Sequence, residues 1–131
     1  MDNQGSERKE IRLGKKELEI MKVVWRLGRA TVHDVKEVLG SGRKPAYSTI
    51  LTMMRKLEIK GYLTHEVAAR TYIYSPAISK GSVTQSLLQD LLDRLFDGSP
   101  SLLVNSLLAL GEVSDSELDE IRKLLEREKD S

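Results

Sequence analysis

The sequence has 131 residues, 40% of them hydrophobic and 31% charged, which is enough for one ordinary domain or for a small domain with an assembly segment. The absence of cysteine excludes disulfides, thiol nucleophiles and cysteine-ligated metals. No apolar run approaches the roughly 18 residues of a membrane span, and the start is polar, so we expect a cytoplasmic protein without direct membrane insertion. The net charge is +1, but the charged residues are unevenly distributed: residues 1–80 hold 16 Lys and Arg against 9 Asp and Glu, and residues 81–131 hold 5 against 11. This predicts a basic part that attracts polyanions. The alternative is a chance imbalance in two solvated surfaces.

The first 40 residues predict a short arm and two helices. Residues 1–11 are polar and aperiodic, and are predicted to be disordered. Apolar residues then recur at helical spacing, with Gly14 as the N-cap and Gly28 just after the helix end. The sequence TVHD at 31–34 resembles a capping box and predicts a second helix that continues to Gly40.

A third helix is predicted at about 47–60, after the turn sequence GSGRKP. At about 100° per residue it has two faces. The apolar face carries Tyr47, Ile50, Met53, Met54 and Leu57, and the opposite face carries Ser48, Thr49, Thr52, Arg55, Lys56 and Lys60. Ile59 falls on the polar face, where we expect the following hairpin to cover it.

Period-two alternation from Tyr62 to Pro76, rich in Thr, Tyr, Val and Ile, predicts a β-hairpin. Its turn lies near Arg70 and lacks a strong turn dipeptide, so the loop is not fixed to the residue. Helix, helix, helix and hairpin form a winged helix-turn-helix, which we assign to residues 12–80.

The C-terminal part, residues 81–131, predicts three leucine-rich helices capped by Ser82, by Ser99 and by the SDSE box that starts at Ser114. So short a segment buries this much apolar surface poorly by itself, and we expect a helical dimerisation domain. The alternative is that it folds back onto the first domain. The predicted dimerisation residues are Leu87, Leu88, Leu91, Leu92, Leu95, Leu103, Leu107, Leu118, Ile121 and Leu125.

The polar face of the third helix suits the major groove of DNA, because hydroxyl side chains are slim and bind base edges or phosphates, while basic side chains neutralise phosphates. The early residues of a recognition helix usually face the bases. The predicted DNA-binding residues are Arg43, Lys44, Ser48, Thr49, Thr52, Arg55, Lys56 and, at the hairpin tip, Arg70. Each has a simpler explanation, as a helix-capping residue or as part of an ordinary solvated surface.

Several stretches resemble the penicillinase-repressor family, the winged-helix repressors of β-lactamase and methicillin-resistance genes. They are LEIMKVVWRLG, TVHDVKEVL, AYSTILTMMRKLEIKGYL and RTYIYSP, and the resemblance runs from about Leu13 to the end. It implies a homodimeric repressor of a palindromic operator, with Ser48, Thr49, Thr52 and Lys56 on the recognition helix and the C-terminal helices as the dimer module.

The same resemblance implies a partner, a membrane-bound sensor metalloprotease that cuts the repressor within SLLVNSLLAL. The family is cut between an Asn and a Phe. Asn105 matches the first position, but Ser106 stands at the second. A copper-responsive branch carries a cysteine-rich tail that this chain lacks, so copper sensing is not expected.

No catalytic set is visible, and we expect neither an enzyme nor a cofactor or metal site. His33 and His65 are isolated, and the acids from Asp115 to Glu120 match a helix N-terminus. The remaining rival is a winged helix that binds protein without sequence-specific DNA binding.

Overall fold

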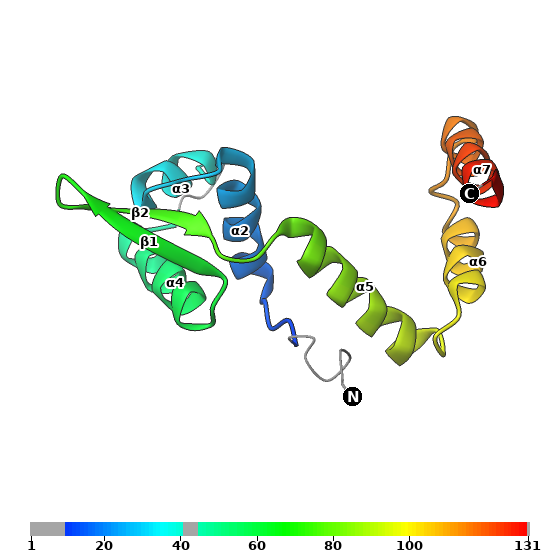
Figure 1. The fold of residues 1–131 in the computed structure, drawn as a ribbon, viewed down its shortest axis with the longest axis horizontal. Coiled ribbons are helices and arrows are strands. Elements are labelled where there is room, and N and C mark those ends of the chain that lie inside the picture. Colours follow the sequence, from blue (N-terminus) through cyan, green and yellow to red (C-terminus); the bar gives the residue numbers. More distant parts are fainter. Residues whose placement is uncertain (1–9, 41–44, 131) are drawn as a thin grey trace. The chain divides into compact units, whose positions relative to one another are not determined.

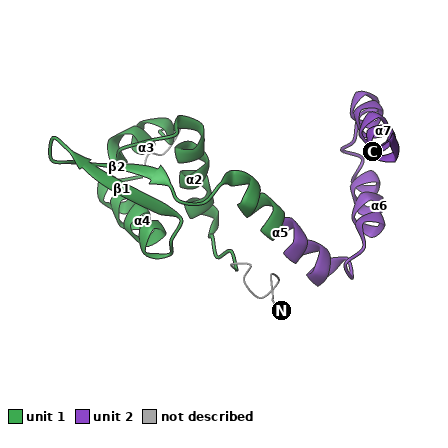
Figure 2. Cartoon of the chain, viewed as in Figure 1, with its two compact units in different colours: residues 1–87 green, residues 88–131 purple. Residues whose placement is uncertain are grey.

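In the computed structural model, which describes residues 10–40 and 45–130, helices and one antiparallel hairpin follow each other in the predicted order (Figure 1). The elements are α2 (Lys15–Leu27), α3 (Val32–Val38), α4 (Tyr47–Ile59), β1 (Leu63–Ala68), β2 (Thr71–Pro76), α5 (Lys80–Leu95), α6 (Pro100–Leu110) and α7 (Asp115–Asp130). They form two compact units, residues 1–87 and 88–131, and the division falls within α5 (Figure 2). The domain limits drawn from the sequence, 12–80 and 81–131, remain predictions.

The first two helices begin at the predicted N-cap residues, and the second has the predicted reciprocal capping box. The Gly14 amide donates to Glu17 Oε1 at 2.9 Å. The Thr31 amide donates to Asp34 Oδ2 at 3.0 Å, and the Asp34 amide donates back to Thr31 Oγ1 at 3.1 Å. Each pair satisfies backbone donors that a helix start leaves free, so sequence alone defines where these helices begin.

The core of the first unit lies between α2, α3, α4 and the hairpin. It comprises Ile20, Met21, Val23, Val24, Ala30, Val32, Val35, Ile50, Met54, Leu57, Tyr62, Leu63 and Tyr74. Ala30, in the extended link between α2 and α3, pairs with Tyr74 through backbone hydrogen bonds of 2.8 and 2.9 Å. This bridge joins the hairpin to the helices.

In the hairpin, strands β1 and β2 pair from Leu63 opposite Pro76 to Ala68 opposite Thr71. Ala69 and Arg70 form the connection, and both have positive φ, 50° and 66°. Two successive left-handed residues give a turn whose twist matches the strands, but the conformation favours Asn and Gly. The hairpin is as predicted. Because its turn residues are Ala and Arg and not Asn and Gly, the sequence does not indicate the position of the turn.

An ion pair joins the start of α2 to the end of α4. Lys60, at the end of α4, lies 2.9 Å from both carboxylate oxygens of Glu17, and it also donates to the Arg12 carbonyl at 3.1 Å. The Arg12 amide in turn donates to the Tyr62 hydroxyl at 2.8 Å. Ile11, within the arm expected to be disordered, packs against the core, whereas residues 1–9 lie outside the described residues.

The C-terminal helices also begin at serines, with one correction. Ser99 accepts from the Leu102 amide, and Ser114 shares a capping box with Glu117, as predicted. Helix α5 begins at Lys80 and not at Ser82, because the Ser79 hydroxyl accepts from the Ser82 amide at 3.0 Å and thus starts the helix earlier. Among the helices described, none is long and apolar enough to cross a membrane.

Candidate nucleic-acid interface

Helix α4 presents the predicted hydroxyl and basic side chains outward. Its apolar residues at helical spacing, Ile50, Met54 and Leu57, are buried in the core. The side chains opposite them, Ser48, Thr49, Thr52, Arg55 and Lys56, are all exposed. The condition that the DNA interpretation requires of this helix, a slim polar face open to a ligand, is therefore met.

Three other residues of α4 differ from expectation. Tyr47 is 50% exposed and does not belong to the core, because it lies in the first turn beyond the packed part of the helix. Ile59 is 85% exposed, so the expectation that the hairpin covers it was wrong. Lys60 is engaged by Glu17 and the Arg12 carbonyl, and is therefore not part of the free basic face.

A groove of about 370 Å³ separates α4 from the wing and from the start of α3. It is lined by Thr31, Val32, His33, Tyr47, Leu51, Arg55, Arg70, Thr71 and Tyr72. None of these described residues is acidic, and the two arginines come from different elements. Such a groove accepts an anionic chain without repulsion.

The groove contains polar residues that the sequence did not assign to DNA binding, namely Thr31, His33, Tyr47, Thr71 and Tyr72. Thr31 was already assigned as a cap, and Tyr72 was one residue of an alternating strand. Only the packing of α3, α4 and β2 brings them together. The alternation could have identified Tyr72, since an aromatic residue on an exposed strand often marks a contact surface.

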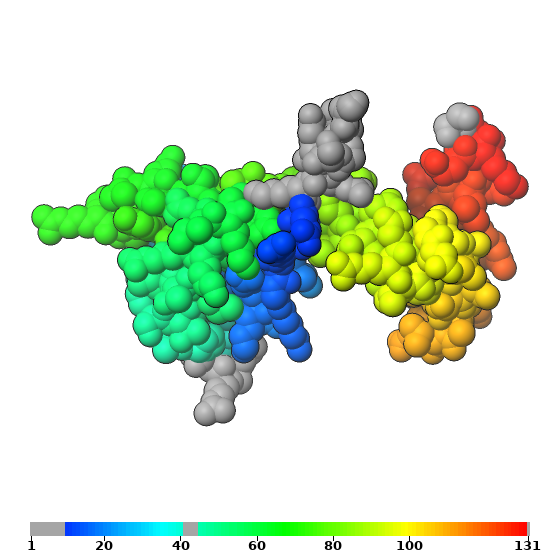
Figure 3. All heavy atoms as spheres, turned by 90° about the horizontal axis from the view of Figure 1, so that it is seen from below, coloured from blue at the N-terminus to red at the C-terminus, as the bar shows by residue number. Residues whose placement is uncertain are grey.

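Arg70 lies at the exposed tip of the wing, which projects beyond the helices of its unit (Figures 1 and 3). Arg70 lines the groove together with Arg55 of α4. This position agrees with a contact to a DNA backbone that passes between α4 and the wing. Arg43 and Lys44, the remaining predicted DNA-binding residues, lie outside the described residues.

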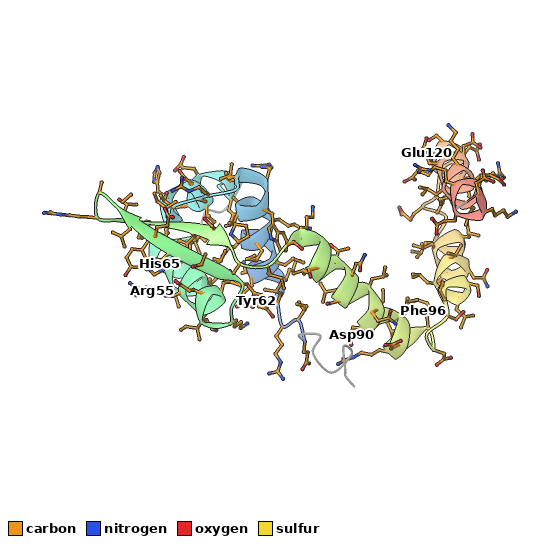
Figure 4. All side chains as sticks on the ribbon, in the orientation of Figure 1. Arg55, Tyr62, His65, Asp90, Phe96 and Glu120 are labelled. Carbon is orange, nitrogen blue, oxygen red and sulfur yellow. The ribbon has the colours of Figure 1, made fainter. Side chains whose placement is uncertain are left out.

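The acid on the same helix contacts the wing. Glu58 Oε2 lies 2.7 Å from His65 Nδ1, and Glu58 Oε1 lies 2.8 Å from it. The His65 ring stacks on Tyr72, with ring centroids 4.0 Å apart and an 8° angle between the planes. Figure 4 shows His65 on β1 and Arg55 on the neighbouring α4.

Two side chains behind this surface have shifted pKa values. Burial, which alone would raise the pKa of Glu17, is outweighed by hydrogen bonds from Lys60 and the Gly14 amide and by the charges of Lys60 and Lys56, so the pKa lies below its ordinary 4.5. Burial, followed by the nearby Glu58 carboxylate, raises the pKa of the Tyr74 phenol above its ordinary 10.0. Both shifts follow from packing within the first unit.

Metal-binding chemistry finds no support in the described part of the chain, where no three His, Asp or Glu side chains cluster in a way that could hold an ion. His65 is occupied by Glu58, and His33 lies in the groove apart from it.

The predicted dimerisation residues lie on α5, α6 and α7. No residue of α6 or α7, all of them described, is buried. Seven of the ten predicted residues are more than a third exposed, with Leu95 at 69% and Leu125 at 58%, while Leu92, Leu103 and Leu118 are half-buried. A monomer would leave a large apolar surface in water.

The comparisons with known proteins identify a family for most of the chain. Residues 13–127 match a family model described as penicillinase repressor. A penicillinase repressor from Bacillus licheniformis is 29% identical over 113 residues, which are 86% of this chain and 88% of that protein. The methicillin resistance regulatory protein MecI from Staphylococcus aureus (strain N315) is 20% identical over 127 residues, 97% of this chain and 99% of its own.

Among solved structures, the DNA-binding domain of the repressor BlaI matches with a TM-score of 0.50 and 31% identity. The match covers 57% of this chain and 92% of that domain. Together with the element order, it confirms the predicted winged-helix fold class.

Proposed function

The chain belongs to the penicillinase repressor family, and on this premise we propose that it is a DNA-binding transcriptional repressor, acting as a homodimer on a palindromic operator. The family is one of repressors and not of enzymes, which confirms the prediction that the chain is not an enzyme. The observation that carries the proposal is the exposed hydroxyl and basic face of α4 beside a groove whose described lining holds no acid.

In this proposal α4 enters the major groove with its first turns toward the bases. Ser48, Thr49 and Thr52 are small enough for the backbone of the helix to come close, and their hydroxyls bond base edges while a Thr methyl meets a thymine methyl. Arg55 and Lys56, one turn further along, neutralise phosphates. Arg70 contacts the backbone, or the minor groove beside it, from the wing.

The dimer follows from the apolar surface of α5, α6 and α7. Leu91 and Leu95 on α5 and Leu107 on α6 are exposed although they are leucines in well-capped helices, and a second copy offers the same surface. A twofold dimer presents two copies of α4, so the DNA site should contain two inverted half-sites. The competing arrangement, in which the C-terminal helices cover the first domain, predicts a monomer.

We also propose release by cleavage between Asn105 and Ser106, by a membrane-bound sensor metalloprotease. The support is the family resemblance and the exposure of both residues on α6. Because the bond lies within a helix, α6 has to open locally before a protease can bind an extended strand there. Incubation of the repressor with such a protease, followed by mass spectrometry, should give fragments that end at Asn105, and any other cut position contradicts this step.

The test of DNA binding needs no knowledge of the operator. Selection from a pool of random duplexes should enrich sequences with two inverted half-sites, and binding should weaken steeply as salt rises, because several phosphates are contacted. The rival, a winged helix that binds only protein, predicts no enrichment at any salt concentration.

A variant locates the interface. Thr49→Glu should abolish binding to the selected duplex, because a carboxylate in the major groove faces base edges and phosphates, while sedimentation still gives the dimer. The control is Thr84→Glu, the same change at an exposed threonine of α5, which should bind as the native protein does. If the two variants bind alike, α4 has been misassigned.

A further inference from the structure

Three side chains connect the recognition helix to both strands of the wing. Glu58 belongs to α4, His65 to β1 and Tyr72 to β2. His65 is the centre of the set, with its Nδ1 at 2.7 and 2.8 Å from the Glu58 carboxylate oxygens and its ring 4.0 Å from the parallel ring of Tyr72. We call Glu58, His65 and Tyr72 the helix–wing clamp.

The clamp lies next to the groove that we assign to DNA. Tyr72 lines that groove with Arg55 and Arg70. Arg70 forms the turn two residues before Tyr72, and Arg55 lies one helical turn before Glu58. The helix–wing clamp therefore connects α4, which carries Arg55, with the wing, which carries Arg70.

Among the side-chain hydrogen bonds described, that of Glu58 with His65 joins α4 to the wing. Tyr74, on the same face of the hairpin, is buried, yet among the described residues its hydroxyl has no hydrogen-bond partner. The Ala30–Tyr74 bridge attaches the hairpin to the link before α3 and not to α4. The side chains of Glu58 and His65, 30% and 26% exposed, are shielded enough for their contact to be specific.

Glu58 also poses an electrostatic problem that the clamp solves. A free carboxylate on a helix that approaches phosphates would oppose binding. With its oxygens on the His65 ring, Glu58 is directed toward the wing.

We propose that the helix–wing clamp positions Arg70 relative to α4, so that the wing contacts the backbone of the same duplex whose bases α4 reads. This inference rests on the proposed function. His65 and Glu58 are positioning residues in it, because they act through Arg70 and not by touching DNA.

The test is a double-mutant cycle on binding to the selected duplex, with His65→Ala and Arg70→Ala singly and together. In the native background Arg70→Ala should weaken binding about tenfold and lower the slope of log affinity against log salt by about 1. In the His65→Ala background, Arg70→Ala should weaken binding less than about twofold and leave the salt slope unchanged, because Arg70 is no longer held at the DNA backbone. Thr64→Ala, at the neighbouring exposed position of β1, is the matched control and should leave the full effect of Arg70→Ala.

Loss of fold is a separate outcome and is checked by circular dichroism. If His65→Ala unfolds, the cycle is run with Glu58→Gln, which keeps the side-chain shape and removes the charge, and the expected result is the same loss of the Arg70 effect. A merely structural clamp would lower affinity in every variant without changing the cost of Arg70→Ala, and equal costs in the clamp-free and native backgrounds overturn the inference. Failure of the native protein to bind any duplex at low salt overturns the proposed function as well, so the two failures are distinct.

Discussion

The ring and the hydroxyl of Tyr74 have opposite effects on the stability of the fold. Its ring is fully buried in the core and its backbone pairs with Ala30, but within the described residues its hydroxyl has no partner. A buried hydroxyl without a hydrogen bond costs on the order of 1–3 kcal/mol. Its carbon skeleton stabilises the fold, whereas its oxygen destabilises it.

Tyr74→Phe should therefore raise the free energy of unfolding by about 1 kcal/mol at pH 7, measured by urea denaturation. The pH dependence supplies a second check. Because the folded pKa of the phenol is raised above 10.0, the fold favours the neutral form, and this contribution is present below that pH and lost as pH rises through the folded pKa. The Phe variant should lose less stability in this alkaline range than the native protein, and equal losses would contradict the assignment.

Lys56, in the last turn of α4, and Lys60, directly after the helix, should behave oppositely. Lys60→Met leaves the buried Glu17 without its cation, and should lower the free energy of unfolding by about 1 kcal/mol after allowance for solvent screening. It should change DNA binding little. Lys56→Met should leave stability within about 0.5 kcal/mol and weaken DNA binding, because that side chain is exposed.

Acid titration separates the two lysine variants further. The lowered pKa of Glu17 contributes stability above the ordinary value of 4.5, and this contribution is lost as pH falls through the folded pKa. Lys60→Met should show a shallower loss of stability on the acid side than Lys56→Met. If both titrate like the native protein, the ion pair does not control that range.

At the scale of the elements, the sequence signals that worked were local. The N-caps at Gly14 and Ser99 and the capping boxes at Thr31 and Ser114 each depend on residues within one turn, and all are present as predicted. The start of α5 was misplaced because Ser79 and Ser82 are both plausible caps, and the choice depends on which hydroxyl meets a free amide. The engagement of Lys60 by Glu17, 43 residues away, has no local signal at all.

The wing turn gives a prediction at the same scale. Ala69 holds φ near 50°, a left-handed conformation that costs an ordinary L-residue roughly 1 kcal/mol and that Asn adopts more readily. Ala69→Asn should therefore raise the thermal midpoint by a few degrees, as measured by calorimetry, without altering DNA affinity. Ala68→Asn, within the paired strand, is the control and should not stabilise. A stabilising effect at both positions would show that the gain does not come from the turn.

At the scale of the whole molecule, the groove and the apolar C-terminal surface explain different parts of the proposed activity. The groove is assembled from α3, α4 and β2, so its residues could not be grouped from sequence spacing. The apolar surface was visible in the sequence as leucines that recur at helical spacing between polar residues. The exposure of those leucines in the single chain is what the proposed dimer would remove.

Leu91→Asp should convert the dimer into a monomer, because it places a charge in the apolar surface of α5. Sedimentation at micromolar concentration should show a dimer for the native protein and a monomer for the variant. The variant should retain weak binding to one half-site and lose the avidity of the full palindrome, about a hundredfold or more. Gln85→Asp, at an exposed polar position of the same helix, should remain a dimer.

The contact between Arg12 and Tyr62 has a practical consequence for labelling. Because the Arg12 amide is held by the Tyr62 hydroxyl and its carbonyl by Lys60, a fluorophore or affinity tag joined directly to Glu10, in place of residues 1–9, enters the fold beside the end of α4. That point lies about 18 Å along the helix axis from Ser48. A tag joined at Glu10 therefore leaves the early turns of α4 unobstructed, and this position suits an imaging tag better than the leucine-rich helices, where its bulk would oppose the proposed pairing.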